Sequence, residues 1–299
     1  MKKTKIIYYL FPFHIDMLER TINQLKRASN YSNLSDYLSL DIVLNLSDKN
    51  LDWSKCSIPK QYFIDKFKYI EKYCDFCYEV NFEINDNLLG SGAQHRRTHK
   101  NNKGEYNIIA LDPDVYFPPQ IFQVLEHVIP TIEQENTPTY MISSQIPKWW
   151  DSSWDIVSHP EYLKSDIKFD EIDVFKLESK LDLNNINILK NYNHKFAGGW
   201  FNFYSSELSK LMEIPESIGI FYHQDLFYQE KFKILNKKGY DIPQYIVQNC
   251  LIAEDRKYYH KNEFFHSKDL PYQKNRPHMG NSNEVLQIVN EEVKKIYNE

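Results

Sequence analysis

Apolar runs alternate with amphipathic stretches along the first half of the chain. Strands are expected at residues 5–11, 40–46, 77–84 and 107–111, and those at 5–11 and 107–111 are apolar runs of the kind that forms buried strands. Helices are expected between and after them, at residues 15–28, 60–74 and 118–132. The prolines at 118 and 119 suit the first turn of the last helix. Strands that alternate with helices favour a parallel sheet with helical crossovers.

The second half of the chain has a less regular pattern. Strands are predicted at 139–146 and 243–253, an aromatic strand pattern lies within 194–208, and a helix is predicted at 223–239. The polar, acidic stretch 163–192 is expected to be a surface excursion. A docked terminal helix is predicted from one apolar helical face, formed by Val285, Ile288, Val289, Val293 and Ile296. The expected fold is α/β, with a mixed, mainly parallel sheet flanked by helices and a C-terminal helical tail.

Composition narrows the classes of function. The 299 residues are 42% hydrophobic, which allows a substantial core, and the net charge of -5 argues against a general nucleic-acid binder. Four cysteines are too few for a disulfide framework, and the single C-x-x-C at Cys74 and Cys77 has no second pair at zinc-finger spacing. No apolar stretch reaches the roughly 18 residues that cross a bilayer. We expect a cytoplasmic protein without a transmembrane segment, with room for peripheral contact at the inner face of the membrane.

Two aspartates follow directly on the buried run 107–111, in the sequence NIIALDPDVYFPP. Pro113 between them disfavours helical backbone at Asp112, and in an extended chain Asp112 and Asp114 would point the same way. Two converging carboxylates repel each other unless a cation lies between them. Ligands bind beyond the carboxyl ends of strands in open α/β sheets, so this strand end is a candidate divalent-metal site.

Four segments in order resemble a GT-A fold nucleotide-sugar glycosyltransferase, similar to the bacterial family-2 enzymes. They are YYLFPFHIDML, LDPDV, FAGGWFNF and HQDLF, and together they span roughly residues 5 to 255. The resemblance implies a glycosyltransferase domain over 1–270, followed by the docked helix in 271–299. Within that domain, residues 1–138 would form the nucleotide-sugar-binding half and residues 139–270 the acceptor-binding and catalytic half.

The resemblance implies roles for three acidic residues. Asp112 and Asp114 match the D-x-D that holds Mn²⁺ or Mg²⁺ against the donor diphosphate, where the metal neutralises charge on the leaving group. Asp225 in HQD matches the general base of inverting enzymes, which removes the acceptor proton. Gln224 and Tyr222 depart from the glutamate and the glycine frequent in the family. A solvated turn at 112–114 and a helix-start acid at 225 are the structural alternatives.

Further residues would line the donor and acceptor. Asp48 follows the second strand where relatives contact the nucleobase, Pro12 ends the opening strand, and Arg96, rather than Arg97, is expected to meet the diphosphate. Gly198, Gly199 and Trp200 match a segment that lines the donor sugar and acceptor, although a strand bulge fits the same residues. The tryptophans at 149, 150 and 154 would shape an acceptor subsite or simply pack.

The sequence does not decide which residue would be the further ligand of the metal site. Relatives add a C-terminal ligand, and Glu254 and His266 are equal candidates, with His260 also near. Glutamate and histidine both suit Mn²⁺.

The resulting hypothesis is a hexosyltransferase-type enzyme that moves a sugar from a nucleotide diphosphate donor to a carbohydrate or glycolipid acceptor. Inversion of the anomeric carbon and a role in surface polysaccharide or lipopolysaccharide synthesis are implied by the resemblance. A metal-dependent phosphoesterase or nuclease could use the same carboxylates, but a nuclease would need a basic track for phosphates. A non-catalytic carbohydrate-binding protein would leave the acids of DPD and HQD without a role.

Overall fold

The structure is a computed structural model of the chain. It describes residues 1–10, 12–46, 53–56, 58–85, 97, 102–148, 163–168, 181–195, 201–216, 218, 224–254 and 282–297. Several residues singled out above fall outside these ranges.

The strands form one large sheet and one small one. Their bounds are β1 (Thr4–Leu10), β2 (Leu38–Asn45), β3 (Glu79–Asn85), β4 (Asn107–Leu111), β5 (Val115–Tyr116), β6 (Met141–Lys148), β7 (Leu163–Lys168), β8 (Asn187–Asn191), β9 (Phe201–Tyr204), β10 (Gln244–Leu251) and β11 (Ala253–Glu254). The large sheet has the order β3-β2-β1-β4-β9-β6-β10-β8, with β7 beside β6, and the small sheet is β11-β5.

The α-helices are α1 (Ile15–Ala28), α2 (Lys60–Glu71), α4 (Ile121–Glu133), α6 (Ser206–Ser209), α7 (Gln224–Lys237) and α11 (Ser282–Ile296). Short 3-10 helices are η1 (Pro12–His14), η2 (Leu34–Asp36), η3 (Trp53–Lys55) and η6 (Leu183–Asn185). Gly239, with φ +97°, follows the last turn of α7, where the Tyr240 N–H bonds back to the Leu235 carbonyl 3.1 Å away. Such a left-handed residue ends a helix at little cost only when it is glycine.

The sheet is parallel in its first part and mixed in its second. Strands β3, β2, β1 and β4 are parallel neighbours. β9 runs antiparallel between β4 and β6, and β8 pairs antiparallel with β10 at the sheet edge. The architecture is α/β and Rossmann-like, which confirms the mixed, mainly parallel sheet predicted from the sequence.

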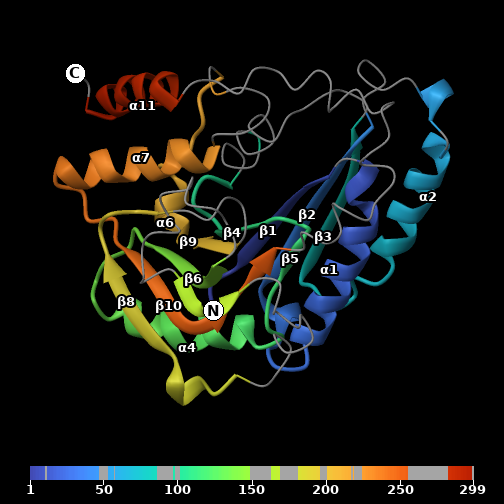
Figure 1. Cartoon of the computed structure of the whole chain (residues 1–299), viewed down its shortest axis with the longest axis horizontal. Coiled ribbons are helices and arrows are strands. Elements are labelled where there is room, and N and C mark those ends of the chain that lie inside the picture. Colours follow the sequence, from blue (N-terminus) through green and yellow to red (C-terminus); the bar gives the residue numbers. More distant parts are fainter. Residues whose placement is uncertain are drawn as a thin grey trace.

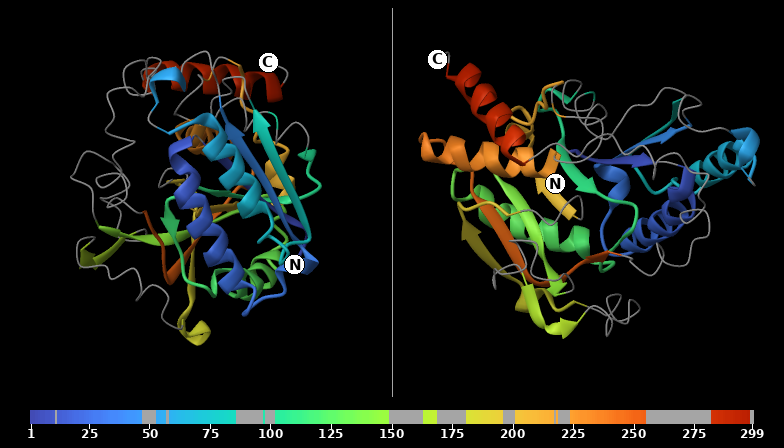
Figure 2. Two further views of the ribbon diagram at one scale, coloured as in Figure 1. Left: turned by 90° about the vertical axis from the view of Figure 1, so that its right-hand side faces the viewer. Right: turned by 45° about the horizontal axis from the view of Figure 1, so that its top comes forward.

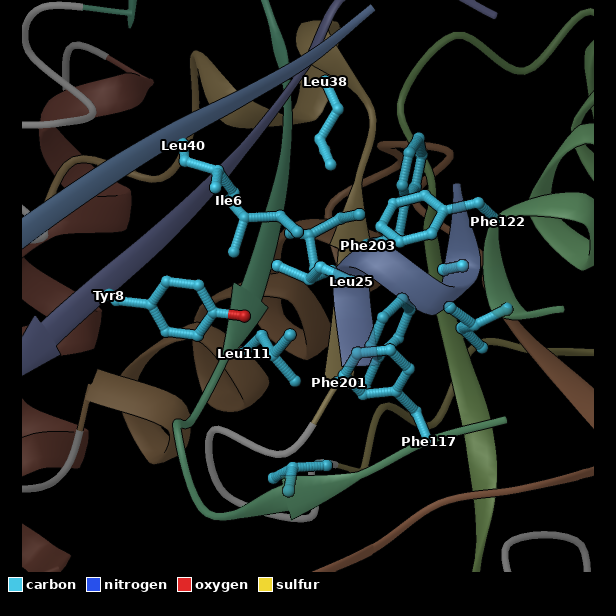
Figure 3. Close-up of a cluster of buried hydrophobic side chains, with 14 of the residues drawn as sticks. Ile6, Tyr8, Leu25, Leu38, Leu40, Leu111, Phe117, Phe122, Phe201 and Phe203 are labelled. Carbon is cyan, nitrogen blue, oxygen red and sulfur yellow. The ribbon is translucent and has the colours of Figure 1, made fainter. Parts of the chain in front are cut away.

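Two hydrophobic clusters cover opposite faces of the sheet, because neighbouring residues of a strand point to opposite sides. Ile6, Tyr8 and Leu10 of β1 pack into a cluster with α1, α2 and α4. Figure 3 shows part of this cluster, in which Tyr8 and Leu111 lie among the buried side chains. Ile7 packs into the other cluster, with α6, α7 and α11. Figure 1 shows α11 beside α7, on the side of the molecule away from α1 and α2, and the right-hand view of Figure 2 shows α11 crossing α7 at an angle.

Most predicted elements lie close to their observed bounds. The helix predicted at 15–28 coincides with α1, and the apolar face of α11 packs through Val285, Val289 and Val293. No helix in the described ranges is long and apolar enough to span a membrane.

Two details of the prediction are wrong. The stretch 163–192 is not only a surface excursion, since it contains β7 and the edge strand β8. β8 is mostly exposed, and an edge strand with few buried positions lacks the apolar alternation that would reveal it. Prolines 118 and 119 precede α4 instead of forming its first turn, and the carbonyl of Pro118 accepts from the Ile121 N–H at 3.0 Å.

Candidate active site

The order of the parallel strands places a topological switch point between β1 and β4. The chain proceeds from β1 to β2 on one side, while β4 pairs with β1 on the other. The carboxyl ends of strands at such a topological switch point form the usual ligand crevice of open α/β sheets. Pro12 lies just beyond β1 and is buried, and Asp112 directly follows β4. Both residues therefore leave the sheet at the switch point.

The D-P-D sequence forms a turn. The Val115 N–H donates to the Asp112 carbonyl at 3.3 Å, which places Pro113 and Asp114 at the central positions. Proline suits the first of them because its φ is already fixed near the required value. The expectation of extended backbone through Asp114 is therefore wrong. The turn places the two aspartates in different environments. Asp114 is only 4% exposed, whereas the Asp112 side chain reaches solvent.

The pKa of Asp112 is raised well above the usual range. Water reaches its side chain, yet desolvation by the surrounding protein is the largest cause of the increase. The charge of Asp114 raises the pKa further, and that of Asp225 adds a smaller contribution. Asp112 is therefore close enough to Asp114 and to Asp225 for their charges to act on it.

Asp225 comes to this site on the first turn of α7. Its Oδ1 accepts a hydrogen bond from the Leu226 N–H at 2.9 Å, and the positive end of the helix dipole favours a carboxylate there. Burial raises the pKa of Tyr204 on β9 well above its usual value, and the charge of Asp225 raises it further. The helix thus carries a carboxylate from the second half of the chain to the strand end of the first half.

After β10, the last strand of the large sheet in the chain, the backbone returns to the D-P-D turn. β11 pairs antiparallel with β5, so that Glu254 lies opposite Val115 and Ala253 opposite Tyr116. The backbone of Glu254 is therefore across from the residue that follows Asp114, while its side chain is outside the described part of the structure. Among the described residues, no three His, Cys, Asp or Glu side chains are grouped closely enough to hold a metal ion.

The strand that follows the glycine pair adjoins the same turn. Phe201, the first residue of β9, is paired with Leu111, the last residue of β4. Gly198, Gly199 and Trp200 themselves lie outside the described residues. The chain on the other side of them is held firmly, because Lys195 is buried and the Gln244 side chain bonds to its backbone.

The remaining predicted residues are placed only in part. Arg97 forms a bidentate ion pair with Glu83 near the end of β3, where Nη1 and Oε1 are 2.7 Å apart. This pair occupies the guanidinium of Arg97, and Arg96 lies outside the described residues. Asp48, His260, His266 and the tryptophans at 149, 150 and 154 also lie outside the described ranges.

Sequence reasoning missed three residues around the turn. Thr21 and Arg20 of α1 contact the Pro113 carbonyl. The charge of Asp112 helps to raise the pKa of the buried Tyr8 hydroxyl. Burial is the main cause that raises the pKa of Tyr8, ahead of Cys77, Cys74 and Asp112. The helical stripe of α1 indicates which of its residues face the core, but no sequence signal pairs that face with residue 113.

Comparison with known proteins adds no relative to this geometry. No protein-family model matches the chain, and no curated protein sequence matches it.

Proposed function

We propose that this protein is a metal-dependent glycosyltransferase of the GT-A type, which transfers a sugar from a nucleotide diphosphate donor to a carbohydrate acceptor. The observation that carries the proposal is the convergence of Asp112, Asp114 and Asp225 at the switch point of an α/β sheet. The first two come from the half that would bind the donor, and the third from the half that would bind the acceptor. Strand-end acids could hold a metal ion against the diphosphate, and a helix-borne acid nearby could accept the acceptor proton.

The donor set fits Mn²⁺ or Mg²⁺. Asp112 and Asp114 are hard oxygen ligands whose mutual repulsion a cation would relieve. Mg²⁺ in particular needs only one or two carboxylates when waters and substrate phosphates supply the other ligands. When bound, such an ion supplies positive charge against the diphosphate leaving group. Glu254 and His266 remain the candidates for a further ligand.

Asp225 is proposed as the general base. Its place at the start of α7 stabilises the carboxylate form, which is the form that accepts a proton from an acceptor hydroxyl. Inversion of the anomeric carbon is part of the same proposal and depends on this role of Asp225. Water is limited around Tyr204 and Asp114, both of which are buried.

The remaining assignments follow the same proposal. Pro12, Asp48 and Arg96 would contact the donor nucleotide, and Gly198, Gly199 and Trp200 the donor sugar or acceptor. Transfer to a carbohydrate or glycolipid acceptor in surface polysaccharide or lipopolysaccharide synthesis, at the cytoplasmic side of the membrane, is the biological setting that we infer.

Thermal unfolding with a panel of nucleotides tests the proposal. Wild-type protein is heated with UDP, GDP, CDP or dTDP, each with Mn²⁺ or with EDTA. A ligand that binds only the folded state at one hundred times its dissociation constant stabilises it by about 2.7 kcal/mol. We expect one nucleotide to stabilise the protein only with Mn²⁺, and Asp114→Asn to abolish this effect. Asp65→Asn, at an exposed position of α2, is the matched control.

The opposite result is equally clear. Stabilisation by Mn²⁺ alone, with no added effect from any of the four nucleotides, would overturn the proposal and favour a metal-dependent phosphoesterase that uses the same carboxylates.

A further inference from the structure

Helix α1 contacts the peptide unit that links the two aspartates of the turn. The Thr21 hydroxyl donates to the Pro113 carbonyl oxygen across 2.6 Å. The same hydroxyl lies 3.0 Å from the Met17 carbonyl one helical turn earlier. A hydroxyl has a single hydrogen, and the shorter contact is the one to Pro113. Thr21 is fully buried, so water does not compete for this bond.

Arg20 holds the same turn from the next position of α1. Its Nη1 donates to the Tyr116 hydroxyl at 2.9 Å, and its Nη2 lies 3.4 Å from the Pro113 carbonyl. The guanidinium also lies over the Tyr116 ring, 4.1 Å from the ring centroid. One side chain therefore contacts the middle of the turn at Pro113 and the end of β5 at Tyr116.

Further interactions also fix the turn. Among them are the 3.3 Å bond between the Val115 N–H and the Asp112 carbonyl and the two-residue pairing of β5 with β11. Pro113 itself has no N–H to donate. Asp112 also lies close enough to Asp114 and Asp225 for their charges to act on it. A rotation of the Pro113 peptide would change the separation of the Asp112 and Asp114 carboxylates, and the contacts from Arg20 and Thr21 oppose that rotation.

We propose that Arg20 and Thr21 are positioning residues that hold the D-P-D turn so that Asp112 and Asp114 present their carboxylates to one divalent cation. This inference rests on the proposed function. Neither residue touches the metal or the donor in the proposal, because both act through the Pro113 carbonyl. Groups that orient metal ligands in this way commonly change metal affinity by about 10- to 100-fold when removed.

A purely structural role for the two residues makes a different prediction. If they only fasten α1 to β5, their loss lowers the unfolding temperature and leaves the Mn²⁺ affinity of the folded protein unchanged. Mn²⁺ affinity is therefore the informative measurement, and unfolding temperature is the reference.

The experiment measures Mn²⁺ binding by electron paramagnetic resonance, alone and with whichever of UDP, GDP, CDP or dTDP binds the wild-type protein. Thr21→Val removes the hydroxyl at nearly constant volume, and Thr21→Ser restores it. Arg20→Met removes the guanidinium, and Tyr116→Phe removes only its hydroxyl partner while keeping the ring. Arg20 is half-buried, so its variant serves if Thr21→Val does not fold.

We expect Thr21→Val and Arg20→Met to weaken Mn²⁺ binding by about 10- to 100-fold, and Thr21→Ser to stay close to wild type. The inference is overturned if Thr21→Val and Arg20→Met bind Mn²⁺ as wild type does, or if Thr21→Ser loses as much affinity as Thr21→Val. A wild-type protein that binds no nucleotide in a Mn²⁺-dependent way would instead overturn the proposed function, and the positioning role with it.

Discussion

Gln244 bonds to both backbone polar groups of Lys195. Its Nε2 donates to the Lys195 carbonyl at 2.6 Å, and its Oε1 accepts from the Lys195 N–H at 2.9 Å. Nε2 also donates to Ser143 Oγ at 2.9 Å, and that hydroxyl donates to Asn202 Oδ1 at 3.0 Å. This buried network ties β10, β6 and β9 to the residues on both sides of the glycine segment.

Replacing Gln244 should lower the free energy of unfolding. Gln244→Ala leaves a buried N–H and a buried carbonyl without their partner, at about 1–3 kcal/mol for each group. We expect the free energy of unfolding to fall by roughly 2–5 kcal/mol, measured by chemical denaturation. Gln248→Ala, at a half-buried position of the same strand, should change it by about 0.5 kcal/mol or less. Equal losses in the two variants would contradict the role of the network.

Asp112 should make the metal-free protein less stable as the pH rises. Above about pH 4 an unfolded aspartate has lost its proton, whereas native Asp112 keeps it up to its raised pKa. The native state then binds more protons than the unfolded state, so the free energy of unfolding falls with increasing pH. Asp112→Asn removes this contribution.

Denaturation of wild type and Asp112→Asn in EDTA, at about pH 5 and about pH 8, measures the effect. We expect the variant to gain on the order of 1 kcal/mol relative to wild type at the higher pH, a modest value because water reaches the side chain. The same pH dependence in both proteins would show that the pKa of Asp112 is not raised in the native state.

Asp225→Asn separates proton transfer from donor binding. Loss of a general base lowers kcat by about 100- to 10,000-fold, and the amide keeps the size and shape of the carboxylate. We expect the Mn²⁺-dependent affinity for the nucleotide to be retained, as measured by calorimetry. Glu230→Gln on the same helix, where Glu230 bonds to Lys233 at 2.8 Å, is the control. A variant of Asp225 with undiminished turnover would exclude it as the base.

Docking of α11 should depend on its buried face. Val289 is fully buried in the cluster shared with Phe227 and Phe232 of α7, whereas Leu286 is 36% exposed. Val289→Asp places a carboxylate among these rings and removes a side chain whose burial contributes about 1.5–3 kcal/mol. We expect a loss of at least about 3 kcal/mol in unfolding free energy, against about 0.5 kcal/mol for Leu286→Asp. Similar effects of both substitutions would argue against the docked position.

The sequence by itself determined most of the elements and their order. The apolar stripe of residues 15–28 predicted α1, and the run 107–111 predicted β4 with two aspartates just beyond it. Such patterns are local, because burial of one face repeats at 3.6 residues in a helix and alternates in a strand. They also predicted that the parallel strands would put Asp112 and Asp114 at a carboxyl edge.

Only the tertiary structure decided which residues meet at that edge. The antiparallel insertion of β9 between β4 and β6, the edge pairing of β8, and the approach of Asp225 to Asp112 depend on contacts between distant segments. The turn at Pro113, which buries Asp114 and exposes Asp112, is anchored by Thr21 of α1, which is distant from it in sequence. Periodicity reports which face of a segment is buried but not which partner covers it, and the partner decides how the carboxylates are placed.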